Sequence, residues 1–357
     1  MYLRYVELQN FRNYKKRSLE FSKQLNVILG PNGIGKTNIL EAIYVLSQGK
    51  SWRSQYDFEL IQNKKDFLNI KAKALIKKED TLLFLAIQKG LGNRSKKAFK
   101  INESPKTMKG FIGTLKSVLF SPDDLEIITG SPSKRRRFLD EVLVQTDEEY
   151  KKKLSNLKKV VSSRNKILQN IFEGQGKEAE LEFWNLNLLK FSNYVTDKRA
   201  ELVQYLNKYL NENFSSLSNT KSKLKITYKK SPISKERLTK YYAKELGARR
   251  TLIGAQKEDL IIEFSKDKDI FVNTRFFASR GEQRTASFML KLGTLDFIKE
   301  KTGQEAILLL DDIYSELDIY HREALSTYFH NSQIIITSSE KDLIPKKILE
   351  NSKVFKL

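Results

Sequence analysis

The 357-residue chain has no cysteine, only two histidines and no long apolar run. Without cysteine it has no disulfide framework, thiolate metal site or cysteine nucleophile. His321 and His330 cannot build a histidine-rich metal centre and leave little scope for histidine acid–base chemistry. No apolar stretch reaches the roughly 18 residues of a membrane span, and the first ten residues lack a signal-peptide core. We therefore expect a cytoplasmic protein that does not enter a membrane.

Negative charge is scarce relative to positive charge. The chain has 65 Lys and Arg against 43 Asp and Glu, a formal net charge of +22. This surplus indicates a polyanionic partner, either nucleic acid or an anionic membrane surface, although a merely well-solvated basic surface is the alternative. Hydrophobic residues form 40% of the chain, enough for a sizeable core. At roughly 150 residues per domain, the length corresponds to about two domains.

The first part of the chain alternates between strand and helix patterns, as α/β folds do. We expect a helix over 38–48, where apolar residues recur at helical spacing. The strands expected around it cover 2–9, 24–29, 68–76, 81–88 and a strand–turn–strand over 97–109.

From residue 133 to about 217, apolar residues recur every three to four positions, which predicts two long helices joined by a turn at 173–176. They form either a projecting antiparallel arm or a compact helical subdomain. Further on, a helix is expected over 281–301, with strands at 258–264, 268–272, 306–310, 333–337 and 353–357. The expected organisation is thus an α/β head split by a helical insertion, with segments 1–132, 133–245 and 246–357.

A phosphate-binding loop follows the strand expected at 24–29 and precedes the helix at 38–48. Its residues fit the pattern Gly-x4-Gly-Lys-Ser/Thr: Gly30, Pro31, Asn32, Gly33, Ile34, Gly35, Lys36 and Thr37. Glycines allow backbone N–H groups to turn toward a phosphate, and the helix N-terminus, with Asn38 in its first turn, adds positive potential. Lys36 is expected to reach the β- and γ-phosphates of ATP, and the Thr37 hydroxyl to bind Mg²⁺.

A second acidic element completes such a site. The apolar run 307–310 predicts a buried strand, and Asp311 and Asp312 follow at its C-terminal end. Asp311 is expected to hold Mg²⁺ through water, and Asp312 to act on the attacking water. The candidate catalytic residues are therefore Lys36, Asp311 and Asp312, and the candidate metal ligands are Thr37 and Asp311.

Three further segments define the subclass. The signature-like segment resembles the Ser-Gly-Gly-Gln motif of ABC-type ATPases and consists of Ser279, Arg280, Gly281, Glu282 and Gln283. A serine hydroxyl at a helix N-terminus is a second phosphate-binding surface, which becomes useful when a second subunit brings it over the γ-phosphate. Residues 315–318 resemble a D-loop at such a dimer seam. Residues 334–338 occupy the place of the switch histidine, which is absent.

Together these motifs resemble the RecF family of bacterial recombination-repair ATPases, an ABC/SMC-like class, over nearly the whole chain. Further points of resemblance are the segments 8–14, 38–44, 120–125, 135–140 and 278–284. The resemblance implies ATP-induced homodimerisation, slow hydrolysis, binding of single-stranded, gapped or duplex DNA, and cooperation with RecR and RecO in loading recombinase. It also implies that Arg12 lies near the nucleotide.

Some positions depart from common ABC or RecF patterns. Ser121-Pro122 stands where related ATPases have a Q-loop glutamine, and Asp312 stands where most ABC ATPases have Glu. An Asp is one methylene shorter than Glu, so the sequence predicts slow turnover. RecF proteins usually read Gly-Pro-His-Arg-Asp-Asp-Leu over 254–260, whereas this chain has Gln256 and Lys257 and so lacks a bidentate Arg fork there.

The location of a DNA contact is left open by the sequence. Phosphate contacts would come from some of the basic clusters, although each alone is more often a solvated face. The clusters are 64–65, 94–100, 134–137, 151–153, 158–159 and 229–230, and the arginines at 135–137 would alternatively form salt bridges.

Other interpretations of the protein's function are a transporter's nucleotide-binding subunit and an SMC-type tether, for which the insertion is short. A dinucleotide-dependent dehydrogenase is excluded because its glycine motif is missing.

Overall fold

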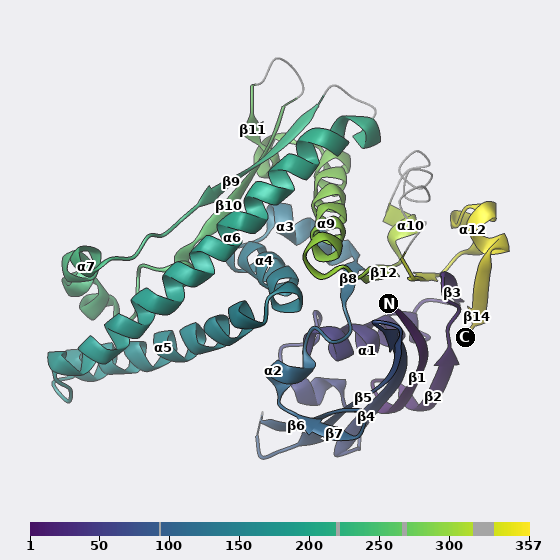
Figure 1. Cartoon of the computed structure of the whole chain (residues 1–357), viewed down its shortest axis with the longest axis horizontal. Helices are drawn as coiled ribbons and strands as arrows, with labels where there is room; N and C mark the ends of the chain where they lie inside the picture. Colours follow the sequence, from purple (N-terminus) through teal and green to yellow (C-terminus); the bar gives the residue numbers. More distant parts are fainter. Residues whose placement is uncertain (93, 219–221, 266–269, 317–331) are drawn as a thin grey trace. The chain divides into compact units, whose positions relative to one another are not determined.

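The computed structural model describes the chain except for residues 93, 219–221, 266–269 and 317–331 (Figure 1). Its described part divides into two compact units. The head unit comprises Met1–Asp124 and Phe288–Leu357, and the arm unit comprises Leu125–Ser287. The division of the chain into three domain segments stays a proposal, with the bounds 1–132, 133–245 and 246–357.

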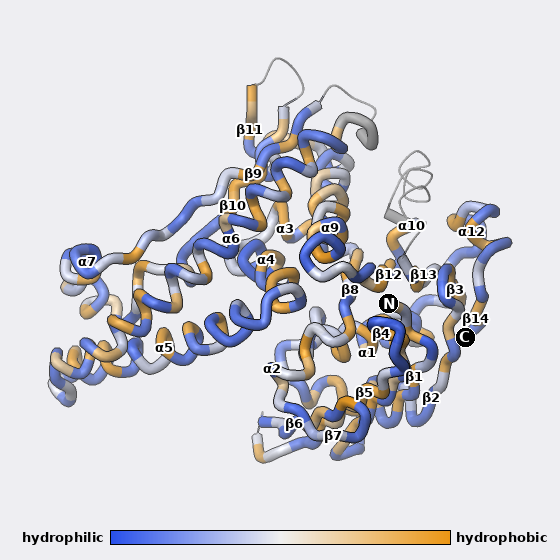
Figure 2. The backbone as a smooth tube through the Cα atoms, in the orientation of Figure 1, coloured by the Kyte–Doolittle hydropathy of each residue, from blue (hydrophilic) through white to orange (hydrophobic). Residues whose placement is uncertain are grey.

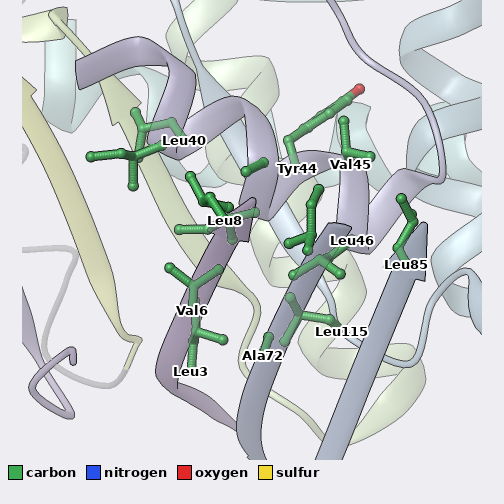
Figure 3. Packing of buried hydrophobic residues seen from close by; sticks show 14 of the residues in the cluster. Leu3, Val6, Leu8, Leu40, Tyr44, Val45, Leu46, Ala72, Leu85 and Leu115 are labelled. Atoms are coloured by element: carbon green, nitrogen blue, oxygen red, sulfur yellow. The ribbon is translucent and has the colours of Figure 1, made fainter. Parts of the chain in front are cut away.

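The head unit contains a six-stranded antiparallel sheet in the order β2-β1-β4-β5-β6-β7. Its strands are β1 (Tyr2–Phe11), β2 (Tyr14–Glu20), β4 (Phe67–Ile76), β5 (Glu79–Lys89), β6 (Ser95–Ile101) and β7 (Ser104–Lys106). Alternate residues point to one face, where helix α1 (Lys36–Gln48) covers them. Leu3, Val6 and Leu8 of β1 pack there near Leu40 and Leu46 of α1 (Figure 3). This core supports the helix that follows the phosphate-binding loop.

The second sheet of the head unit is fully parallel and has the order β14-β3-β13-β12-β8. Its strands are β3 (Leu25–Leu29), β8 (Ser117–Phe120), β12 (Ile307–Asp311), β13 (Ile334–Ser338) and β14 (Ser352–Lys356). β8, β12 and β13 are buried throughout, as their near-continuous apolar sequences require. Because the strands run in one direction, the loop after β3 and the residues that end β12 meet at the same edge.

Three long helices, rather than the two expected, form the arm unit: α4 (Pro132–Thr146), α5 (Glu148–Phe172) and α6 (Leu181–Ser218). Asp147 interrupts the first of the expected helices, because its extended backbone and side chain cap α5. Its carboxylate accepts a hydrogen bond from the Tyr150 N–H at 2.8 Å. α5 and α6 pack along each other (Figure 1). Hydrophobic and hydrophilic residues alternate along both helices in Figure 2, as a single buried stripe requires.

The arm unit also has an antiparallel sheet in the order β11-β10-β9, and a fourth helix. These elements are β9 (Lys223–Lys229), β10 (Asp259–Ser265), β11 (Val272–Asn273) and α7 (Lys235–Ala248). Of the strand expected at 268–272, residues 268 and 269 lie outside the described part. The lysine-rich β9 was not predicted, and neither were α7, β2 and β8. The short elements are α2 (Met108–Phe111), α3 (Glu126–Thr129), α8 (Thr274–Phe277), α10 (Ile313–Glu316) and α12 (Lys346–Glu350).

Helix α9 (Arg280–Thr302) begins in the arm unit and ends in the head unit. Short 3-10 helices lie at Asp57–Leu60, Pro122–Leu125, Glu178–Glu180, Ala255–Lys257 and Lys341–Leu343. Among the helices described, none is both long enough and apolar enough to cross a bilayer.

Buried arginines connect the elements of the arm unit. Arg199 of α6 bonds Asp140 of α4 at 2.8 Å and Glu258, just before β10, at 3.0 Å. Arg164 of α5 bonds Glu245 of α7 at 2.6 Å. Of these five side chains, all except that of Asp140 are almost fully buried. Removing one partner of such a pair leaves a buried charge unpaired, so these pairs fix which elements are neighbours.

Leu188 on α6 tests the packing of the arm unit. Its side chain is fully buried, so Leu188→Ala is expected to lower the free energy of unfolding of this unit by about 2–5 kcal/mol. The chain has two tryptophans, so a Trp52→Phe background leaves Trp184 on α6 as the fluorescent reporter during urea unfolding. Leu186→Ala on the same helix, where the leucine is 51% exposed, is the matched control. Equal losses in both variants would contradict this packing.

Candidate nucleotide-binding site

The phosphate-binding loop connects β3 to α1 at the edge where the parallel strands end. Gly33 and Gly35 adopt φ values of +82° and +118°, which residues with a side chain rarely adopt. A Cβ atom at Gly35 would lie 2.6 Å from the Tyr14 hydroxyl and 2.7 Å from Nδ2 of Asn13. The glycine is therefore required by both backbone conformation and the close approach of the β1–β2 turn.

Lys36, the first residue of α1, folds back over the loop. Its Nζ donates hydrogen bonds to the carbonyls of Gly30 at 2.7 Å and Pro31 at 3.0 Å. Burial lowers the pKa of this amine, whereas the nearby carboxylates of Asp312 and Asp311 act in the opposite direction. The structure thus brings the predicted lysine and both predicted aspartates within electrostatic range of one another.

Asp311 lies at the meeting point of three elements. Its Oδ1 accepts hydrogen bonds from the hydroxyls of Thr37 at 2.8 Å and Thr337 at 2.9 Å. Thr337 is its register partner on β13, between β12 and β3. Burial raises the pKa of the Asp311 carboxyl, and the two threonine hydroxyls partly offset this effect. The predicted metal residues Thr37 and Asp311 are therefore brought together.

This pair fits the requirements of Mg²⁺. Mg²⁺ in nucleotide sites is typically held by one or two protein oxygens together with phosphate oxygens and water. A hydroxyl and a carboxylate oxygen 2.8 Å apart at the start of α1 supply that kind of oxygen pair. Within the described ranges, no group of three or more His, Asp or Glu forms a separate metal site.

Asp312 occupies a strained position directly after β12. Its φ is +51°, and its N–H donates to the Thr337 hydroxyl at 3.0 Å. Non-glycine residues with positive φ are uncommon and often lie at functional sites. Thr337 thus contacts both acidic residues. It belongs to the segment 334–338, which stands where many ABC ATPases have the switch histidine. The sequence identified this place but did not assign Thr337 a role.

Arg12 fastens the β1–β2 turn to helix α1. Its Nε and Nη2 donate to both carboxylate oxygens of Glu41 at 2.8 and 2.7 Å. It also donates to the Glu59 carbonyl and the Ser54 hydroxyl, and its side chain is 22% exposed. Glu41 is fully buried, so the pair is geometrically fixed. A nucleotide contact by Arg12 stays a prediction.

The β1–β2 turn also contacts the loop directly. Asn13 donates through Nδ2 to the Ile34 carbonyl at 2.7 Å, and Asn38 donates to Oδ1 of Asn13 at 2.9 Å. Arg53 donates to Oδ1 of Asn38 at 3.2 Å, and its charge acts to lower the pKa of Asp311. No role was predicted for Asn13 or Arg53, because neither sequence pattern nor residue spacing reveals that their segments fold over the loop.

The signature-like segment lies in the arm unit at the start of α9. Ser279 and Glu282 form a capping box, in which the Ser279 N–H and hydroxyl donate to Oε2 of Glu282 at 2.7 and 2.9 Å. Ser279, Arg280 and Gly281 are exposed. Gln283 is buried, and its amide lies 3.2 Å from the carbonyls of Thr274, Arg275 and Ala278. Gln283 therefore fixes the turn before the helix.

Other predicted elements are placed only in part. Ser121 follows β8, and its N–H donates to Asp124 at 2.8 Å. The expected D-loop, Ser315 to Asp318, begins in α10, but Leu317 and Asp318 lie outside the described residues. Arg135 pairs with Asp259 at 2.7 Å, the salt-bridge alternative considered from the sequence.

Comparison with known proteins identifies the family. Residues 2–356 match the model of the RecF/RecN/SMC N terminal domain. The DNA replication and repair protein RecF of Halalkalibacterium halodurans is 34% identical over 372 residues, which cover 100% of this chain and 98% of that protein. This chain belongs to the RecF family.

Solved RecF structures have the same fold. One described as the recombination mediator protein RecF-ATPrS in the RecFOR pathway is 29% identical, with a TM-score of 0.89 and coverage of 100% of this chain and 96% of the other. A second, described as RecF-ATP, is 30% identical, with a TM-score of 0.87 and coverage of 96% and 93%. The predicted mixed α/β head of SMC type, interrupted by the helical insertion, is confirmed.

The buried Asp311 carboxyl predicts a pH-dependent stability. Because its native pKa lies above that of the unfolded chain, the native state binds the proton more tightly, and wild-type stability falls as pH rises through the native pKa. Without nucleotide, Asp311→Asn is expected to raise the melting temperature by about 1–4 °C at pH 7. The gain should shrink toward pH 4.

Differential scanning fluorimetry across this pH range measures the effect. Asp342→Asn, at an exposed position in the head unit, is the matched control and should leave the melting temperature unchanged. A less stable Asp311→Asn protein at pH 7 would contradict the account of a carboxylate destabilised by burial.

Proposed function

We propose that the protein is an ATP-dependent DNA-binding protein of recombinational repair, which binds ATP between two copies of the chain and hydrolyses it slowly. The observation that carries this proposal is the junction of Thr37, Asp311 and Thr337 beside a complete phosphate-binding loop. Membership of the RecF family supports it, as does the description of solved relatives with ATP or ATPrS. The family assignment also weighs against the transporter reading.

The head unit supplies the first half of the proposed pocket. Backbone N–H groups of the loop over 30–37 and the N-terminus of α1 attract the phosphates. Lys36 would exchange its carbonyl partners for phosphate oxygens, and the Thr37 hydroxyl oxygen and the Asp311 carboxylate would hold Mg²⁺. When bound, Mg²⁺ neutralises developing charge on the phosphates. Arg12 and Asn13 hold the β1–β2 turn against this loop.

The second half comes from the signature-like segment of the other copy. In the capping box, the Ser279 N–H and hydroxyl both donate to one carboxylate oxygen of Glu282. These are the donors a phosphate would use at a helix N-terminus, so the carboxylate acts as an internal substitute for that anion. Binding ATP across two copies makes it a ligand that favours the dimer over the monomer.

Slow hydrolysis follows from the residues beside the proposed phosphate position. The backbone of Asp312 has a positive φ, and its N–H donates a hydrogen bond to the Thr337 hydroxyl. Its carboxylate is one methylene shorter than the Glu of most ABC ATPases, and a threonine stands in place of an imidazole. A slowly hydrolysed nucleotide suits a timed clamp on DNA. The net charge of +22 supports a polyanionic partner, with gapped DNA, RecR and RecO suggested by the family resemblance.

The shared pocket is tested by molecular mass in solution. A non-hydrolysable ATP analogue is expected to double the mass of the wild-type protein in analytical ultracentrifugation. Lys36→Ala should stay monomeric because it loses phosphate affinity, and Ser279→Arg because it blocks the second half. Ser162→Arg, an exposed serine on α5, is the matched control and should dimerise. Nucleotide-driven dimerisation that survives Ser279→Arg would contradict a shared pocket.

Asp312→Asn separates hydrolysis from dimerisation. The change removes the carboxylate that would act on water while keeping the side-chain volume, so the turnover rate should fall about 100-fold or more. Nucleotide-induced dimerisation should persist. Steady-state phosphate release at saturating ATP gives the rate. An unchanged rate would exclude Asp312 as the base.

A further inference from the structure

The loop from Gly254 to Lys257 in the arm unit is held rigidly by its neighbours. Gly254 adopts a φ of +108°, and its N–H donates to the Ser231 hydroxyl at 3.2 Å. The N–H of Ala255 donates to Ser192 at 2.7 Å, and the carbonyl of Ala255 accepts from the buried Arg199 at 2.8 Å. The backbone thus cannot move without breaking contacts to α6. Lys257 follows in the same loop, and its side chain is exposed.

Arg136 of α4 reaches the same loop. Its Nη1 donates to the carbonyl of Glu258, the residue after Lys257, at 2.6 Å. The side chain is half-buried, so the arginine is anchored by a neutral acceptor and not by a carboxylate. Arg250, an exposed residue shortly after α7, is a further charged neighbour of Lys257.

The carboxylates around this group of cations already have other arginine partners. Asp259 pairs with Arg135, and Glu245 pairs with Arg164. Asp140 and Glu258 both pair with Arg199. Among the residues that the structure describes, no carboxylate forms an ion pair with Arg136, Lys257 or Arg250. Lys257 and the two arginines that act on it electrostatically therefore make no direct ion pair with a described carboxylate.

Arg250 and Arg136 both act electrostatically on Lys257. Partial desolvation of this otherwise exposed amine lowers its pKa most, followed by the charges of Arg250 and Arg136. Burial and the charge of Arg199 likewise lower the pKa of Arg136. Carboxylates act in the opposite direction, Glu245 on Lys257 and Asp259, Asp140 and Glu258 on Arg136. These carboxylates already form ion pairs with other arginines, so a bound anion would supply a further counter-charge.

We propose that Arg136, Lys257 and Arg250 form a phosphate-binding site for the backbone of duplex DNA. This site deepens the proposed function and rests on its DNA-binding part. The three side chains offer only donors and positive charge, which suits phosphodiester oxygens and gives no means of reading bases. Because the loop backbone and α4 are fixed by contacts within the arm unit, the backbone that carries Lys257 and Arg136 is in place before DNA arrives.

Salt-dependent binding of a fluorescent duplex of random sequence tests the site. Each lost phosphate contact reduces the slope of log K against log salt by about 0.9, so affinity should fall roughly five- to tenfold per residue at 0.1 M salt. Lys257→Gln and Arg250→Gln should each show this loss, and the double variant should lose slope by about 1.8. Lys257→Arg, which keeps the charge, should bind like the wild type.

Lys208→Gln, at an exposed lysine on α6, is the matched control and should keep the wild-type slope. Melting temperatures within about 1 °C of wild type are expected for these exposed substitutions. If wild-type protein binds duplex with salt-dependent affinity but Lys257→Gln and Arg250→Gln bind equally well, the site is wrong and the proposed function survives. If the wild type fails to bind DNA, both are overturned. If the variants lose binding to polyglutamate but keep duplex binding, the surface accepts an acidic protein and the proposal is wrong.

Discussion

A single buried carboxylate oxygen joins the elements of the candidate nucleotide site. Oδ1 of Asp311 accepts from Thr37, which begins α1, and from Thr337, which belongs to the neighbouring strand β13. This junction exists because β3, β13 and β12 are adjacent and parallel, so that their C-terminal ends share an edge. Burying the carboxylate is unfavourable without nucleotide, as the raised pKa of Asp311 shows. A cation at this position would remove that penalty, which links the fold of the sheet to the ligand it suits.

The arm unit uses charge in two different ways. Inside, Arg164 and Arg199 are paired with carboxylates and specify which helices and loops are neighbours. Half-buried Arg136 and exposed Lys257 lie beside those pairs, and no carboxylate in the described part of the chain forms an ion pair with either of them. The nearby carboxylates form ion pairs with the buried arginines and therefore do not pair with Arg136 or Lys257. A structural network and a binding surface are thus two consequences of the same distribution of arginines.

Sequence patterns predicted the parts of the structure in which one local signal dominates. The apolar runs of β3, β12 and β13 and the glycine pattern of the phosphate-binding loop are such signals, and Thr37 and Asp311 lie together as expected. Sequence patterns did not predict the segments whose local structure is determined by tertiary contacts. β9 is rich in lysine, and its conformation depends on pairing with β10. The break at Asp147 depends on one side-chain cap, and Arg53 and Asn13 reach the site through segments whose folding no periodicity reveals.

Complementation between two inactive variants tests most directly whether one nucleotide is held by two copies of the chain. Lys36→Ala disables the phosphate-binding loop, and Ser279→Arg disables the signature-like segment. In a mixed dimer, one of the two pockets receives an intact loop from one copy and an intact signature-like segment from the other. Mixing the purified variants should therefore restore ATP hydrolysis well above that of either alone. If the mixture is no more active than the separate variants, while each still binds wild-type protein, the pocket is not shared and the account is wrong.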